Sequence, residues 1–181
     1  MADREVPRLD ELDELLRSEA VPRGLISRGD APKIWERHIM DCLRAVGEVR
    51  TEDRTSYDLG SGAGLPGLVV ALACPGLEVT LVERRQSRAA FLELAVEKLE
   101  LTNARVWAGD VRGLRTQVDI CFARAFAPVL KAWQIARPLL VEGGRLIYFA
   151  GEGFADEGLP GARVTKAPQL ASWGPLVIMS R

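Results

Sequence analysis

Apolar residues repeat at helical spacing in the first third of the chain. The first stripe consists of Leu9, Leu12, Leu15 and Leu16. It predicts an amphipathic helix over residues 9–20, which Pro22 and Gly24 would end. A second helix is predicted from about Asp30, a good N-cap, with Pro32 in its first turn. The apolar stripe of this helix consists of Trp35, Ile39, Cys42, Leu43 and Val46.

From Thr55 onward, short apolar strands alternate with amphipathic helices. Strands are predicted over residues 56–59, 78–83, 105–108, 118–123 and 145–150. Helices are predicted between them over residues 68–74, 87–101 and 129–140. This alternation predicts a mostly parallel sheet with helices on both faces.

The C-terminal tail has a different pattern. Residues 162–165 and 176–180 are rich in β-forming residues, and no helix is predicted between them. Two strands joined without a crossover favour an antiparallel hairpin at the edge of the sheet. The one plausible boundary lies near residues 47–54. We therefore predict a helical extension over residues 1–50 and a Rossmann-like domain over residues 51–181.

The amino-acid composition and the net charge indicate which class of protein this chain belongs to. Among the 181 residues, 48% are apolar and 27% are charged, which is typical of one globular domain and argues against disorder. The net charge of −1 predicts no large basic surface, so a nucleic acid would have to contact a local patch.

The cysteines and the longest apolar stretch bear on metal binding and location. Cys42, Cys74 and Cys121 lie far apart and the chain has one histidine, so we predict no metal site. The cysteines are expected to be small buried residues in a reducing compartment. Residues 65–74 are too few to span a bilayer, and residues 1–19 lack an apolar signal core. These patterns predict a soluble cytoplasmic protein and leave its oligomeric state open.

The segment DLGSGAGLPG, residues 58–67, lies where the first predicted strand turns into a helix. Glycines at such a turn let the backbone approach a ligand closely, and the helix N-terminus favours an anionic group. The spacing Gly62-x-Gly64-x-x-Gly67 also matches the dinucleotide-binding fingerprint. That match alone does not choose the ligand.

Three acidic residues narrow the choice of ligand. Asp58 lies inside the first strand, where a carboxylate would repel a pyrophosphate and suit an ammonium group, such as that of S-adenosylmethionine. Glu83 ends the second strand, at a strand end that we expect to be exposed, where an acid accepts ribose hydroxyls. Asp110 follows the third strand and could accept from the adenine amino group. Parallel strands bring all three to one crevice.

Each acid also has a structural interpretation. Asp58 could accept backbone N–H groups of its own turn. Glu83 could be a solvated partner for Arg84 or Arg85, and Asp110 could be a turn or cap residue. These alternatives compete with the ligand contacts and need the structure to decide between them.

Three segments together resemble the RsmG (GidB) family. They are GSGAGLPG, RHIMDCL around His38, and ARAF around Arg124, and the resemblance runs from about Leu25 to Phe149. It implies a class I S-adenosylmethionine-dependent methyltransferase fold. It also implies methyl transfer to N7 of a guanine in 16S ribosomal RNA, with the small ribosomal subunit as the partner.

The resemblance also indicates site residues. We expect Arg124 and His38 at the methyl-transfer site. The expected cofactor-binding set is Asp58, Gly60, Ser61, Gly62, Gly64, Leu65, Glu83, Asp110, Val111 and Arg124. Several positions depart from the family pattern. Ala150 stands where the family usually has lysine, and Ala123 stands in place of a serine. Residues 24–26 read Gly-Leu-Ile rather than Asn-Leu-Thr, and residues 110–112 read Asp-Val-Arg rather than Arg-Ala-Glu.

Other interpretations of the basic and imidazole groups stay open. His38 could be a packed imidazole tied to Asp41, and Arg124 could be the structural partner of an acid such as Asp119. Arg84, Arg85 and Arg88 could form an RNA patch, although a solvated helix face is favoured slightly. A small-molecule methyltransferase or a non-catalytic S-adenosylmethionine-binding module are the alternative functions.

Overall fold

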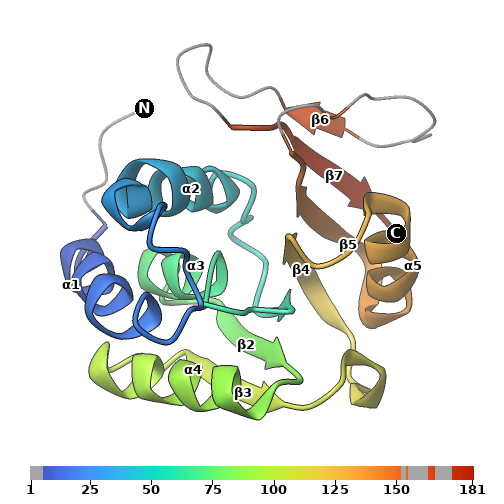
Figure 1. Cartoon of the computed structure of the whole chain (residues 1–181). Helices are drawn as coiled ribbons and strands as arrows, with labels where there is room; N and C mark the ends of the chain where they lie inside the picture. Colours follow the sequence, from blue (N-terminus) through green and yellow to red (C-terminus); the bar gives the residue numbers. More distant parts are fainter. Residues whose placement is uncertain (1–5, 152–153, 155–162, 166–172) are drawn as a thin grey trace.

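A seven-stranded sheet in the order β3-β2-β1-β4-β5-β7-β6 forms the centre of the molecule (Figure 1). This computed structural model describes residues 6–151, 154, 163–165 and 173–181. Strands β1 to β5 are parallel, and β7 runs antiparallel between β5 and β6. Their bounds are β1 Thr55–Leu59, β2 Glu78–Glu83, β3 Ala104–Ala108, β4 Val118–Arg124, β5 Leu140–Phe149, β6 Arg163–Thr165 and β7 Leu176–Ser180. The predicted parallel sheet and C-terminal hairpin are confirmed, except that residue 162 lies outside the described residues.

Helices cover both faces of this sheet (Figure 1). One face carries the helices before β4, and α5 covers the other. The bounds are α1 Leu9–Leu15, α2 Met40–Val46, α3 Gly67–Ala73, α4 Gln86–Lys98 and α5 Val129–Ala136. In the part of the chain that the structure describes, no helix is long and apolar enough to cross a membrane.

The N-terminal helices are less regular than the sequence predicts. A wider π-helical turn, Leu16–Ala20, extends α1, and the second helical segment passes through Ala31–Lys33 and Ile34–Ile39 before α2 begins. Asp30 stands at the N-cap position, but its side chain makes no capping bond. It accepts a hydrogen bond from Ser27 Oγ at 2.7 Å and lies 3.3 Å from Arg37 Nη1 instead.

The junction between α5 and β5 also differs from the prediction. The predicted helix over residues 129–140 ends in a 3₁₀ turn, Arg137–Leu139, and the strand begins at Leu140 rather than at Arg145. Gly143 adopts a φ of 76°, and the pairing of β4 with β5 shifts register between Val118 and Ile120. Gly143 and Gly144 therefore lie inside an irregular strand rather than before it.

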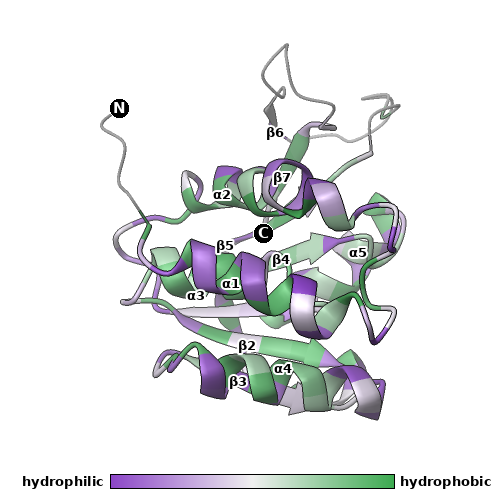
Figure 2. Cartoon of the chain, turned by 60° about the vertical axis from the view of Figure 1, so that its left-hand side comes forward, coloured by the Kyte–Doolittle hydropathy of each residue, from purple (hydrophilic) through white to green (hydrophobic). Residues whose placement is uncertain are grey.

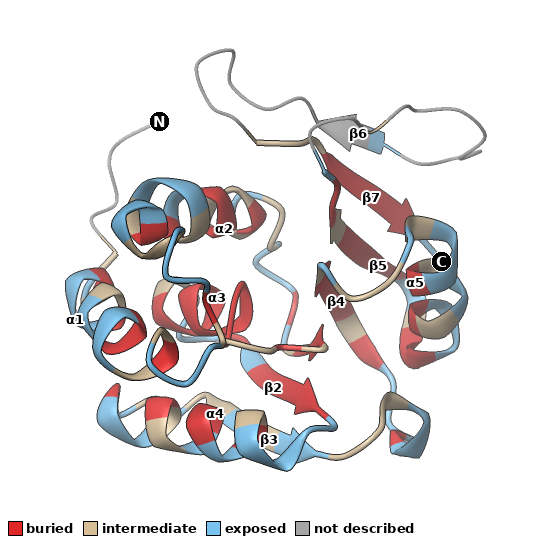
Figure 3. Cartoon of the chain, viewed as in Figure 1, coloured by how far each residue is buried: buried red, intermediate tan, exposed pale blue. Residues whose placement is uncertain are grey.

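The core lies on both faces of the sheet, and the N-terminal helices have no separate core. Their buried leucines belong to the same apolar cluster as α3, α4 and the central strands. Figure 2 shows apolar residues along the strands and helices, and Figure 3 shows that the central strands are largely buried. Arg145 of β5 and Asp53, which precedes β1, form a buried ion pair, with Nη1 and Oδ1 3.0 Å apart. The division of the chain near residue 50 stays a prediction.

Candidate active site

The glycine turn after β1 is held against β2. The backbone N–H groups of Gly60 and Ser61 both donate to Val82 O, at 2.9 and 3.0 Å. Gly60 has a φ of 71°, and a Cβ there would lie 2.6 Å from Phe126 Cδ2. The turn therefore requires glycine at this position, both for its backbone conformation and for the close packing of Phe126.

Two pockets open on either side of this turn. The first, of about 500 Å³, is called the sheet pocket here; its lining includes Gly60, Glu83, Arg84, Arg85, Arg88, Asp110, Val111, Phe126 and Lys131. The second, of about 240 Å³, is called the helix pocket; its lining includes Leu25, Ile26, Ser27, Asp30, His38, Gly60, Ser61, Gly62, Leu65, Arg88 and Arg124. Gly60 and Arg88 line both, so the pockets are the two parts of one crevice at the carboxyl ends of the parallel strands.

This crevice brings the predicted site residues together, except for two. Asp58 and Gly64 are buried behind the turn rather than on the lining of either pocket. The Cβ of any residue replacing Gly64 would press on Leu68 and Leu92, so Gly64 allows helix α3 to pack closely. All the other predicted residues line the sheet pocket, the helix pocket, or both.

Asp58 is 1% exposed and has a partner within its own turn. Its Oδ2 accepts the N–H of Gly67 at 3.2 Å, and its backbone carbonyl accepts the hydroxyl of Ser61 at 2.9 Å. Burial raises the pKa of Asp58 to about 7. The structural interpretation of Asp58 is thus confirmed, and its contact with a ligand ammonium stays a prediction.

Glu83 was expected at an exposed strand end, and that expectation is wrong. The side chain is buried because the glycine turn covers the end of β2, and the residue is 5% exposed. Its two carboxylate oxygens accept the backbone N–H groups of Gly62 at 3.1 Å and Arg85 at 2.8 Å. Glu83 therefore joins the turn to the start of α4 while it lines the sheet pocket.

Asp110 caps a short 3₁₀ turn, Val111–Gly113. It accepts the N–H of Arg112 at 2.9 Å and two bonds from the Arg112 guanidinium at 2.8 and 3.0 Å. These bonds lower the pKa of Asp110 to about 2. The cap interpretation is confirmed, and the ionised carboxylate also lies on the lining of the sheet pocket.

Arg124, at the end of β4, contacts the second helical segment across the crevice. Its Nη2 donates to Nδ1 of His38 at 2.8 Å, and its Nε lies 3.5 Å from Oδ2 of Asp41. Burial, followed by the charge of Arg124, lowers the pKa of His38 to about 4, so the imidazole is neutral at pH 7. Because Nδ1 accepts, the proton is on Nε2, which is buried and unpaired among the described residues.

Two alternatives for these residues are now wrong. His38 bonds to Arg124 rather than to Asp41. Arg124 pairs with Asp41 rather than with Asp119, whose Oδ2 accepts the backbone N–H groups of Arg54 and Thr55, each at 2.9 Å.

Sequence reasoning missed the role of Asp41. This buried carboxylate lies between two guanidinium groups, with Arg44 Nη1 at 2.7 Å and Arg124 at 3.5 Å. Burial raises the pKa of Asp41, and the two arginines oppose that effect. The only sequence signal was the spacing of RHIMDCL, which puts Asp41 one helical turn from His38.

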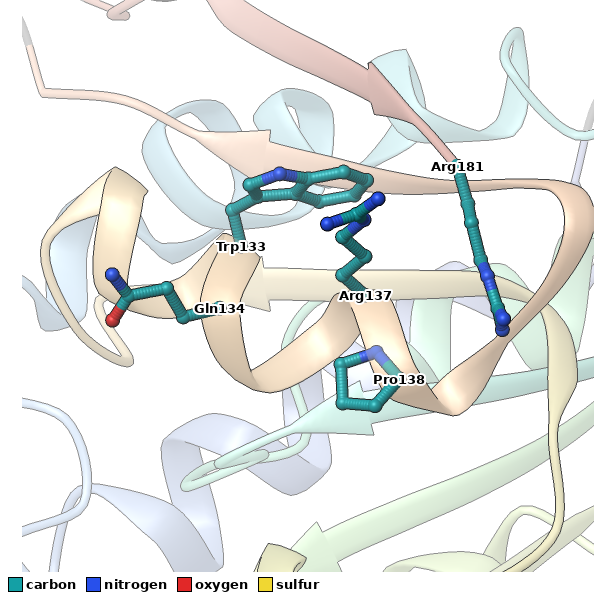
Figure 4. A pocket seen from close by; sticks show the side chains of 5 residues that line it. All are labelled: Trp133, Gln134, Arg137, Pro138 and Arg181. Atoms are coloured by element: carbon teal, nitrogen blue, oxygen red, sulfur yellow. The ribbon is translucent and has the colours of Figure 1, made fainter.

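A third pocket of about 400 Å³ lies at the far end of α5 (Figure 4). Trp133, Gln134, Arg137, Pro138 and Arg181 line it. It contains neither the glycine turn nor the acids, so the chemistry indicated by the sequence belongs to the crevice. Within the described ranges, no group of three His, Cys, Asp or Glu residues could hold a metal ion.

Comparisons with known proteins point to one family. The model of the family GidB, described as rRNA small subunit methyltransferase G, matches residues 6–169. A "Ribosomal RNA small subunit methyltransferase G" of Kineococcus radiotolerans is 41% identical over 172 residues, covering 90% of this chain and 67% of that protein. One of the same name from Thermobifida fusca is 45% identical, covering 77% of this chain and 59% of that protein. The chain thus spans about two thirds of the length of these relatives.

A solved structure is similar in fold. A SAM-dependent methyltransferase from Aquifex aeolicus superposes with a TM-score of 0.64 at 17% identity, covering 88% of this chain and 97% of that one. At this identity the likeness establishes the architecture only, and it agrees with the predicted methyltransferase fold.

Proposed function

Because the chain belongs to the rRNA small subunit methyltransferase G family, we propose that it transfers a methyl group from S-adenosylmethionine to small-subunit ribosomal RNA. The acceptor in this proposal is N7 of a guanine, the activity that the resemblance implies. The observation that carries the proposal is the divided crevice. The carboxylates of Glu83 and Asp110 line one part, and Arg124 with the neutral His38 lines the other.

The residues present fit the cofactor. The sheet pocket has room for an adenosine group, and it offers the carboxylates of Glu83 and Asp110 as acceptors for hydroxyl and amino groups. Gly60 keeps the backbone between the two pockets free of side-chain bulk. The amino acid end of the cofactor would then extend past the glycine turn into the helix pocket. When bound, S-adenosylmethionine supplies an electrophilic methyl group on sulfur.

The reaction requires little acid–base chemistry from the protein. N7 of guanine has a lone pair and carries no proton, so no residue has to act as a general base. The contribution of the protein is to orient the base and exclude water, which can lower a barrier by roughly 7 kcal/mol or more. Arg124, fixed by Asp41 and His38, is a planar donor suited to a phosphate or to the O6 edge of guanine.

The rim of the sheet pocket suits an RNA partner better than a small enclosed substrate. Arg84, Arg85 and Lys131 line this pocket and are exposed. Such cations can contact phosphates even though the net charge of the chain is −1. A ribosomal substrate would place the protein in the cytoplasm.

The test is methyl transfer from labelled S-adenosylmethionine to purified small ribosomal subunits that lack the modification, followed by mapping of the labelled base. We expect label on N7 of one guanine. Parallel reactions with naked 16S RNA distinguish recognition of RNA from recognition of the assembled subunit. Binding of S-adenosylhomocysteine without transfer to either RNA would contradict the RNA substrate and favour the small-molecule or non-catalytic alternative.

A further inference from the structure

Arg88 lies at the boundary between the sheet pocket and the helix pocket. It belongs to the first turn of α4, where its backbone N–H donates to Arg85 O. It lines both pockets, and its Nη1 lies 3.8 Å from the position that a Cβ would take on Gly62. The guanidinium therefore reaches from α4 to the glycine turn, at the point where a ligand would pass from one pocket to the other.

The other guanidinium groups near this point either have partners or line the sheet pocket alone, as the exposed Arg84 and Arg85 do. Arg124 is bound by Asp41 and His38, and Arg112 is bound by Asp110. Arg88 is half-buried, and within the described part of the chain its side chain makes no hydrogen bond or ion pair. A partly desolvated cation without a partner is suited to bind an anion from a ligand.

The cofactor has one anionic group that fits this position. Its adenosine is neutral, and its other end carries an ammonium and an α-carboxylate. If adenosine occupies the sheet pocket, the amino acid end follows the turn from Gly60 to Gly62 and meets Arg88. We propose that Arg88 binds the α-carboxylate of S-adenosylmethionine, with the planar guanidinium making a two-bond contact. This inference rests on the proposed function, because it needs S-adenosylmethionine as the cofactor.

Calorimetry with two ligands tests this contact. S-adenosylhomocysteine retains the carboxylate, and its decarboxylated analogue lacks it but keeps the adenosine and the amine. In Arg88→Gln we expect the affinity for S-adenosylhomocysteine to fall roughly 10- to 100-fold, as loss of a charged hydrogen-bonded pair predicts. The affinity for the decarboxylated analogue should not fall. Arg88→Lys should restore only part of the loss, because it keeps the charge without the fork.

A matched control removes the same charge far from the crevice. Arg50 is exposed and precedes the amino end of β1, whereas the crevice lies at the carboxyl ends of the strands, so Arg50→Gln should leave both affinities unchanged. If Arg88→Gln weakens both ligands equally, or neither, the carboxylate contact is wrong. A loss of RNA binding with unchanged cofactor affinity would also overturn it and assign Arg88 to the RNA. If wild-type protein binds neither ligand, the proposed cofactor itself is wrong.

Discussion

Replacing Asp58 by asparagine tests how strongly this buried acid, which lies under the glycine turn, lowers the free energy of unfolding when it ionises. Burial raises the pKa of Asp58 to about 7, whereas the ordinary value is 3.8. Between these pH values the folded protein keeps a proton that the unfolded chain releases, so rising pH favours unfolding. One pKa unit corresponds to about 1.4 kcal/mol. The contribution of Asp58 to the free energy of unfolding is therefore greatest below pH 3.8. It falls by roughly 4 kcal/mol in total as the pH rises from 3.8 to above 7.

The Asp58→Asn variant should not lose this free energy of unfolding as the pH rises. Its amide oxygen can still accept the N–H of Gly67, but the side chain cannot ionise. We expect the variant to exceed the wild type in free energy of unfolding by about 1–2 kcal/mol near pH 5 and by about 4 kcal/mol near pH 8. Urea unfolding followed by circular dichroism at four pH values between these limits measures the difference.

Asp119→Asn is the control with the opposite sign. Burial alone would raise the pKa of Asp119, but hydrogen bonds from Arg54 and Thr55 hold it below 3.8. The ionised form therefore stabilises the fold above that pH, and the control variant should lose stability near pH 8. A stability difference for Asp58→Asn that does not change with pH, or a variant less stable than wild type near pH 8, would refute the reasoning.

The same variant decides whether Asp58 also serves the cofactor. If its carboxylate contributes to binding the ligand ammonium, Asp58→Asn should weaken S-adenosylhomocysteine binding by about 1–3 kcal/mol while it stabilises the free protein. Unchanged affinity would assign Asp58 to the turn alone.

Three further substitutions probe the crevice. Glu83→Gln leaves one of two part-buried backbone donors facing an amide NH₂. We expect the free energy of unfolding to fall by about 1–3 kcal/mol together with cofactor affinity, and unchanged urea midpoints would contradict this. Gly67→Ala places a Cβ 2.7 Å from Asp58 Oδ2 and should cost about 1–3 kcal/mol, whereas Gly76→Ala, with nothing within 4 Å, should not. Asp41→Asn should slow single-turnover methyl transfer at least ~10-fold with little change in S-adenosylhomocysteine affinity, since Asp41 orients a guanidinium; parallel losses of both would make its role structural.

The sheet could be predicted from the sequence because its signals are local. Apolar runs such as residues 78–83 and 118–123, separated by glycines, prolines and amphipathic helices, predict both the strands and their parallel direction. The irregular elements could not be predicted in this way. Leu140 belongs to β5 because it pairs with Val118, and no pattern within residues 137–145 indicates that pairing.

For the site residues too, local features could be predicted from the sequence and long-range contacts could not. The glycine turn and its acids have local spacing, so the sequence predicts that Glu83 and Asp110 converge at one crevice, but it does not reveal that Asp58 is buried behind the turn. The burial of Glu83 depends on how the turn folds over β2, and the contact of Arg124 with His38 joins residues 86 positions apart. Such contacts arise from the packing of the second helical segment against β4, which one sequence does not reveal.

The shared core of the N-terminal helices has a consequence for the order of events during synthesis. Residues 9–46 are translated before α3 and α4, which supply apolar partners of their leucines. His38 and Asp41 can make their contacts with Arg124 only after the end of β4 has been translated. The helix pocket therefore stays incomplete until the residues that end β4 have been translated, and a chain stopped before β4 would carry the glycine turn without the residues that close the far side of this pocket.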